Sequence, residues 1–266
     1  MNGNILNTAR LVVFGGIISY RALFNWASPS MFLGTLLCAP LVQMLFFVYL
    51  GRQLNVADDR FYVIGNAVLA ASMSSLYGGT MAIANERRFG TLGAVLLSTR
   101  SRLALWLGRG LPYVLNGLIV ASFTLTVGAL LFGLDLSTRM VLLLIPVVLV
   151  AACSCTAFGL VLGAVGLRFR DVMLISNITF TLMLLLTGAN VPRSVLPAWM
   201  VGVGDVLPLT HAAEAARLVT GAAPTDRVLG AIGAEALVGL CHTALAVLLL
   251  RYFEYASRRS GALDVM

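Results

Sequence analysis

Long apolar runs separated by short polar segments are the dominant pattern of this chain. A helix needs about 20 predominantly apolar residues to cross the hydrocarbon core of a bilayer. Six runs meet this requirement: residues 31–50, 61–83, 111–132, 139–167, 172–189 and 228–250. Pro40 lies within the first run, where a spanning helix tolerates it as a kink. The pattern predicts an all-α polytopic membrane protein with six transmembrane helices in one domain, residues 1–266.

Two further segments are partly apolar but do not have the pattern of a span. Residues 10–27 are interrupted by Arg21 and Asn25, and their arginines and tryptophan predict a helix lying in the membrane interface. Residues 190–227 hold four prolines between short apolar pieces. This segment predicts one or two short re-entrant helices in the outer leaflet, because irregular backbone at that depth must be buried in protein or lie beside water.

Residues 84–102 form a charged, amphipathic interruption between the second and third runs. Charges mark both of its ends, with Glu86, Arg87 and Arg88 first and Arg100 and Arg102 last. Between them, helical spacing places four apolar residues on one side of a helix: Phe89, Leu92, Val95 and Leu96. Such a helix either lies on the bilayer surface or docks into another protein, and the residues alone favour neither.

The composition supports the membrane assignment and limits the chemistry. Of the 266 residues, 59% are hydrophobic and only 11% are charged, with a mean hydropathy of +0.94. A soluble domain would carry roughly 25% charged residues. All 18 basic residues are arginine, so the chain cannot form a Walker A phosphate loop, which needs a lysine. The four cysteines lack the spacing of a zinc site or disulfide framework, and we expect the chain to bind no metal and no cofactor.

The net charge of +7 comes from short arginine clusters between the apolar runs. Such clusters mark the cytoplasmic loops of membrane proteins, so we interpret them as topology signals and expect no nucleic-acid partner. Placing both termini in the cytoplasm puts 12 arginines inside and 6 outside. We therefore expect a multi-pass protein of the cell membrane with cytoplasmic N and C termini. The N-terminus lacks a basic segment ahead of an apolar core, so we expect no cleaved signal peptide.

Two stretches carry a resemblance to a known family. One is E-R-R-F-G-T-L-G-A-V-L-L-S-T at 86–99, and the other is T-G-A-N-V-P-R-S-V-L-P-A-W-M at 187–200, continued by L-P-L-T-H-A-A-E-A-A-R at 207–217. With the six-run layout, they resemble the membrane (permease) subunit of ATP-binding-cassette (ABC) transporters of the type-2 exporter class. That class includes permeases for drug resistance, antibiotic export, and polysaccharide or glycolipid export.

The resemblance implies a non-catalytic permease that moves a lipophilic drug, an antibiotic or a lipid-linked glycan outward. ATP and Mg²⁺ would bind to a separate nucleotide-binding subunit, and a second permease copy, identical or related, would complete the complex in the lipid bilayer. An intramembrane enzyme and a secondary transporter are the alternatives. The first would need converging acids, histidines or cysteines, and the second would predict inverted repeats and several intramembrane acids.

The resemblance also implies that residues 84–102 hold a coupling helix, which docks into a groove of the nucleotide-binding subunit. The residues expected to bind that subunit are Glu86, Arg87, Arg88, Phe89, Gly90, Thr91, Leu92 and Leu96. The apolar members would anchor the contact and the charged ones would set its register. The alternative is an interfacial helix with leucines in lipid. Arg168, Arg170 and Asp171 are a second candidate cytoplasmic contact, or else ordinary topology charges on a short loop.

Polar residues inside the runs are candidates for a substrate path between two permease copies. They follow helical spacing in the second and fifth runs: Asn66, Met73 and Tyr77, and then Ser176, Phe180, Met183, Thr187 and Asn190. The alternative is helix–helix packing through hydroxyls and amides. Glu235 is the one acid inside a run, so it is a functional candidate unless it pairs with an arginine such as Arg217.

Overall fold

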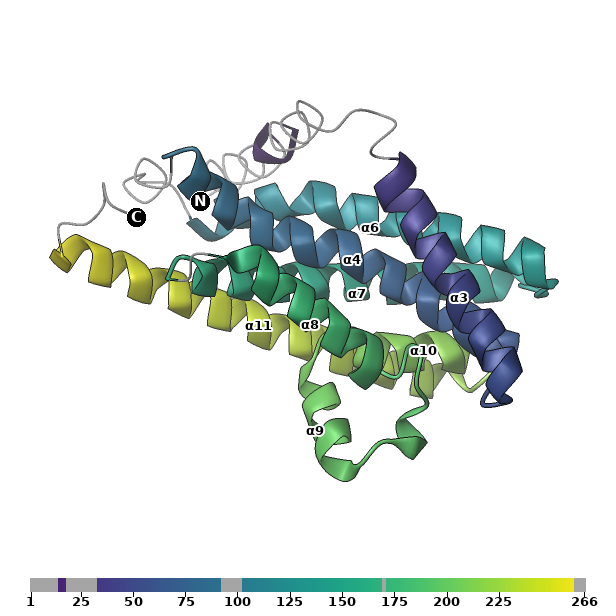
Figure 1. Cartoon of the computed structure of the whole chain (residues 1–266). Coiled ribbons are helices and arrows are strands. Elements are labelled where there is room, and N and C mark those ends of the chain that lie inside the picture. The colour runs from purple at the N-terminus through teal and green to yellow at the C-terminus, as the bar shows by residue number, and fades with distance from the viewer. Residues whose placement is uncertain (1–13, 18–32, 92–101, 169–170, 261–266) are drawn as a thin grey trace.

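A computed structural model describes residues 14–17, 33–91, 102–168 and 171–260. Every regular secondary-structure element in these ranges is a helix (Figure 1). The elements are η1 (Leu33–Cys38), α3 (Ala39–Leu54), α4 (Asp59–Arg88), α6 (Arg102–Phe132), α7 (Thr138–Gly166), α8 (Val172–Leu186), η2 (Arg193–Val195), α9 (Ala198–Val206), α10 (Thr210–Thr220) and α11 (Thr225–Ser260). The all-α prediction is confirmed for this part of the chain.

Among the described residues, five helices are long and apolar enough to cross a membrane. They correspond to five of the six predicted spans, with ends that differ by a few residues. The sixth, α8, has 15 residues, which at about 1.5 Å per residue gives roughly 22 Å, less than the roughly 30 Å of hydrocarbon. The chain is therefore a multi-pass membrane protein whose fifth predicted span is a short helix. Of the predicted interfacial helix at residues 10–27, only 14–17 lie within the described residues.

The first span begins with an irregular turn. Residues Leu33–Cys38 form a π-helix, and the regular helix α3 starts immediately before Pro40. Proline lacks an N–H and clashes with the carbonyl four residues earlier, which disturbs the helix at this position. The structure therefore shows a π-helical turn directly before Pro40, at the position where the sequence predicted a kink.

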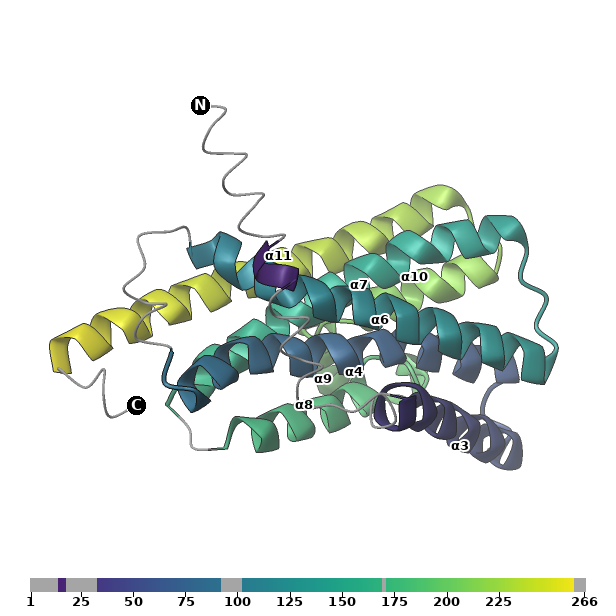
Figure 2. The same ribbon diagram turned by 90° about the horizontal axis from the view of Figure 1, so that it is seen from above.

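Helix α4 is the centre of the bundle, with α6 and α7 packed along it (Figures 1 and 2). In the most apolar 18-residue stretch of α4, 78% of the residues are buried, whereas in the corresponding stretch of α11 only 22% are. Glycines let α7 come this close, because a Cβ on Gly79 would lie 2.4 Å from the Thr156 carbonyl and 3.1 Å from the Gly159 Cα. Small residues at such contacts are the usual basis of helix packing in membranes.

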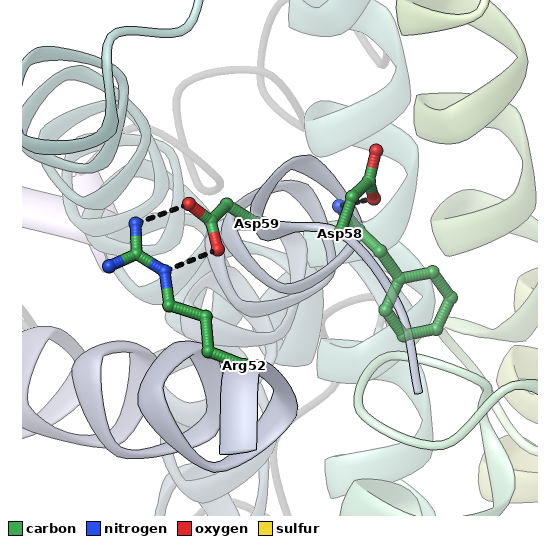
Figure 3. A network of polar contacts seen from close by, with 4 residues as sticks. Arg52, Asp58 and Asp59 are labelled. Atoms are coloured by element: carbon green, nitrogen blue, oxygen red, sulfur yellow. Dashed lines mark hydrogen bonds and ion pairs between the residues drawn. The ribbon is translucent and has the colours of Figure 1, made fainter. Parts of the chain in front are cut away.

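The turn between α3 and α4 is fixed by polar groups at one end of the bundle (Figure 3). Asn55 ends α3 in the left-handed conformation at φ 52°, and the Asp58 carboxylate caps α4 by accepting from the Phe61 amide at 3.0 Å. Arg52 donates two hydrogen bonds to Asp59, from Nε at 2.9 Å and from Nη2 at 2.5 Å. This bidentate pair joins the last turn of α3 to the first turn of α4.

Between α8 and α11 the chain forms η2, α9 and α10, where the sequence predicted one or two short helices. Helix α9 projects from the side of the bundle (Figure 1). Helix α10 is instead packed into the bundle, against α4, α7 and α11. Alanines make this possible, since the α10 residues Ala212, Ala213, Ala215 and Ala216 are all buried. The region therefore has one inserted helix and one projecting helix.

Candidate functional site

Helix α4 ends in a glycine-centred turn within the segment expected to form the coupling helix. Gly90 takes the left-handed conformation at φ 69°. Its amide donates to the Arg87 carbonyl at 3.1 Å, and the Thr91 amide donates to the Glu86 carbonyl at 2.9 Å. This pair of bonds is a Schellman motif. The predicted start of the coupling helix at residue 84 is therefore wrong, because residues 84–88 continue α4 and the chain turns at Gly90. Residues 92–101, which hold most of the predicted helix, lie outside the described residues, and Arg102 begins α6.

The Glu86 carboxylate is engaged inside the chain. It forms an ion pair with Arg109 of α6 and accepts a 2.6 Å hydrogen bond from the Thr91 hydroxyl. The Arg109 guanidinium also lies 5.4 Å from the centroid of the buried Trp106 ring, in cation–π range. The Glu86 and Arg109 side chains are only 15% and 21% exposed. Glu86 was expected to pair with a partner subunit, but in this structure its carboxylate is paired with α6.

Arg87 connects the same end of α4 to α7. Its Nη1 donates to the carbonyls of Gly166 at 3.0 Å and Leu167 at 3.3 Å. These carbonyls lie at the C-terminus of α7, where a cation interacts favourably with the helix dipole. Arg168 and Asp171, from the second predicted contact, follow directly and are exposed. The structure thus brings the two predicted contacts to one end of the bundle.

The remaining residues of the predicted docking segment divide into exposed and undescribed ones. Phe89 is 70% exposed, and Gly90 and Thr91 are exposed beside it. Arg88 is the last residue of α4, and its side chain lies outside the described part of the structure. Leu92, Leu96 and Arg170 also lie outside the described residues. The apolar anchor that the structure does show at this end is Phe89.

Most of the predicted substrate path is buried inside the chain. Asn66, Ser176, Met183, Thr187 and Asn190 are all inaccessible. The Ser176 hydroxyl donates to Thr80 Oγ1 at 3.3 Å, and the Asn66 amide donates to Asn190 Oδ1 at 2.7 Å. Ser176 and Asn190 thereby connect α8 and the segment after it to α4, as in the packing alternative. In this conformation all five residues are buried within the chain, and their role in a substrate path stays a prediction.

Met73, Tyr77 and Phe180 are the predicted path residues that stay partly accessible. The Tyr77 hydroxyl donates to Asn177 Oδ1 at 2.6 Å, and the Tyr77 and Phe180 rings lie 6.1 Å apart. Asn177 and Thr181 are exposed on α8, and the sequence analysis did not include them among the predicted path residues. Their spacing of four residues in an otherwise apolar helix was the available signal. We call Met73, Tyr77, Asn177, Phe180 and Thr181 the α4–α8 face.

The end of α8 is held by an arginine from α10. Gly188 turns the chain at φ 80°, and Arg217 Nη2 donates to the carbonyls of Gly188 at 2.5 Å and Ala189 at 3.2 Å. The guanidinium carbon lies 4.0 Å from the centroid of the Phe61 ring. Burial lowers the Arg217 pKa to about 10, against an opposing effect of Glu214, so the guanidinium remains charged at neutral pH.

Glu235 does not pair with Arg217, which corrects the structural alternative expected for it. It is fully buried on α11, and its two oxygens accept from the backbone amides of Leu209 at 2.8 Å and Ala212 at 3.1 Å. These amides begin α10. Leu209 has no acceptor in its side chain and sits at φ 82°, so α10 has no local cap. Glu235 supplies both halves of a capping box from another helix.

The comparison with curated proteins gives no match. The family model described as "ABC-2 type transporter" matches residues 15–220, which include every described helix from η1 to α10 and both segments that carried the resemblance. This match covers well over half of the chain. The chain therefore belongs to the ABC-2 type transporter family, as a membrane permease subunit.

Proposed function

We propose that this permease is the membrane half of an ATP-driven exporter, energised by a separate nucleotide-binding subunit. The observation that carries the proposal is the meeting of the α4 end, the start of α6 and the α7–α8 turn at one end of the bundle, with Phe89 projecting there. An exposed aromatic side chain surrounded by charges is a typical anchor for a protein partner. This chain has no lysine for a Walker A loop of its own, so the partner would bind ATP and Mg²⁺.

The excess of arginines supports a cytoplasmic location for this end of the bundle. Arg87, Arg109 and Arg168 lie here, together with the charged residues that begin the 84–102 segment. In this orientation the N and C termini are in the cytoplasm of a cell-membrane protein, and the α3–α4 turn and the end of α10 lie toward the outside. A nucleotide-binding subunit in the cytoplasm would then reach Phe89.

The α4–α8 face is the proposed cargo path, completed by a second permease copy. Asn177 and Thr181 are exposed between apolar neighbours on α8 such as Ile178 and Leu182. Polar side chains of spanning helices usually face protein or a water-filled space, because contact with lipid leaves their hydrogen bonds unmade. A mostly apolar face with a few hydrogen-bonding groups suits a lipophilic drug, an antibiotic or a lipid-linked glycan.

The test is co-expression with a candidate nucleotide-binding subunit, followed by purification and reconstitution into liposomes. We expect the two subunits to co-purify and vanadate to stop both ATP hydrolysis and cargo movement. Phe89→Ala should reduce retention of the partner at least tenfold. Phe46→Ala, which removes a similarly exposed ring from α3, is the matched control and should leave retention of the nucleotide-binding subunit unchanged. Transport driven by a proton or sodium gradient without ATP hydrolysis, or residue 90 mapped to the outside of the cell, would refute the proposal.

A further inference from the structure

Two adjacent residues at the end of α4 hold two different helices. Glu86 pairs with Arg109 of α6, and Arg87 donates to the last carbonyls of α7. Beneath them an apolar cluster joins the same helices, with Ile83 from α4, Trp106 from α6 and Leu160 from α7. The end of α4 is therefore fastened to both neighbours by polar contacts placed over a packed core.

The Glu86 carboxylate serves the turn as well as the neighbouring helix. One oxygen faces Arg109 and the other accepts from the Thr91 hydroxyl at 2.6 Å. Thr91 is the first residue after the turn at Gly90, where the chain leaves α4. The pair is largely shielded from water, so it is less screened than an exposed surface ion pair. A displacement of Thr91 would therefore act on α6 through a single carboxylate.

We propose that Glu86 and Arg109 are positioning residues that transmit motion within the chain and make no contact with the nucleotide-binding subunit. The inference rests on the proposed function. When the partner moves the segment after Gly90, the Glu86–Arg109 pair moves α6 together with α4, and Arg87 moves α7. The nucleotide-binding subunit instead contacts exposed groups at this end of the bundle, such as Phe89.

Direct docking by Glu86 would give the opposite result in a charge swap. A carboxylate that pairs with a partner subunit cannot be rescued by changing Arg109. A carboxylate that acts through Arg109 can be rescued, because Glu86→Arg with Arg109→Glu restores opposite charges at the same two positions. An arginine at position 86 can also donate to the Thr91 hydroxyl, which accepts as well as donates.

The experiment compares native protein, Glu86→Arg, Arg109→Glu and the double swap, each reconstituted with the nucleotide-binding subunit in liposomes. The readouts are subunit retention, ATP hydrolysis, and cargo moved per ATP hydrolysed. We expect each single variant to retain the subunit and hydrolyse ATP but to lose at least tenfold in cargo per ATP. The double swap should recover at least half of the native ratio.

The bidentate pair at the opposite end of the bundle provides the control (Figure 3). Asp59→Arg, Arg52→Asp and their swap should leave the transport ratio unchanged. If the single variants do not accumulate, Glu86→Gln and Arg109→Gln replace them. If the double Gln variant loses no more cargo per ATP than the single Gln variants, the two residues act together and the proposal is supported. If the losses of the two single variants add up in the double variant, the proposal is overturned.

Three results would overturn the inference. These are loss of subunit binding in Glu86→Arg, a swap that fails to recover transport, and single variants with a native ratio. A native complex without ATP-dependent transport rejects the proposed function and this inference together. A native complex that transports, with a swap that does not recover, rejects the inference alone.

Discussion

Replacing Glu235 tests how α10 is held within the bundle. Its two carboxylate oxygens accept from the amides of Leu209 and Ala212, which otherwise lack an acceptor at the start of α10. Glu235→Ala removes both acceptors. Glu235→Gln keeps one acceptor oxygen but turns an NH₂ group toward the second amide, so that two donors face each other.

The structure sets the size of the effect. A hydrogen bond to a charged acceptor stabilises by about 1.5–3 kcal/mol, and a buried donor left without an acceptor costs about 1–3 kcal/mol. Because Glu235 is fully buried, water cannot replace it as the acceptor. We expect Glu235→Ala to destabilise the protein by about 3–5 kcal/mol and Glu235→Gln by roughly half as much.

The assay measures unfolding free energy in lipid bicelles by steric trapping, together with amide hydrogen exchange at residues 209 and 212. Both variants should lower the stability and speed exchange at these two amides before the rest of the bundle. Glu214→Gln is the matched control, because Glu214 is an exposed carboxylate on α10, the helix that Glu235 caps from α11. Native stability and native protection at both amides in Glu235→Ala would refute the capping role.

Three further predictions follow from the turn, the arginine and the path. Gly90→Ala puts a Cβ on a residue at φ 69°, so it should lower the unfolding free energy by about 1–2 kcal/mol and weaken ATP-coupled transport in the liposome assay. Gly230→Ala is the control, because its Cβ would meet no atom within 4 Å, and it should lower neither stability nor transport. Arg217→Lys loses the planar group that reaches two carbonyls, so a thermal melt should show a loss of about 1–3 kcal/mol, and a native melt would contradict the contact. Asn177→Leu should reduce cargo transport several-fold while partner retention stays native, and Ile178→Leu should leave transport unchanged; equal transport by both would exclude the α4–α8 face as the path.

The distribution of apolar residues was sufficient to predict the fold class. Runs of about 20 apolar residues must form spans in which the backbone bonds to itself, and helices do this within one segment. The multi-pass all-helical architecture and the family followed from residue patterns alone. The turn at Gly90 was also encoded locally, because a glycine after a charged helical end is a common stop signal, although the amphipathic spacing around it favoured a continuous helix.

Which faces pack and which polar groups meet was decided only by the tertiary structure. In a soluble helix the polar face marks the solvent, but lipid and protein interior are both apolar, so periodicity cannot separate the packed face of α8 from its exposed one. Ser176 and Met183 therefore turned inward while Asn177 stayed exposed. Glu235 accepts hydrogen bonds from backbone amides because α10 inserts beside α11, and these amides take the place of the arginine that the sequence suggested as its partner. Glu86 likewise met Arg109 because α4 and α6 lie side by side, a contact between helices that no spacing along the chain expresses.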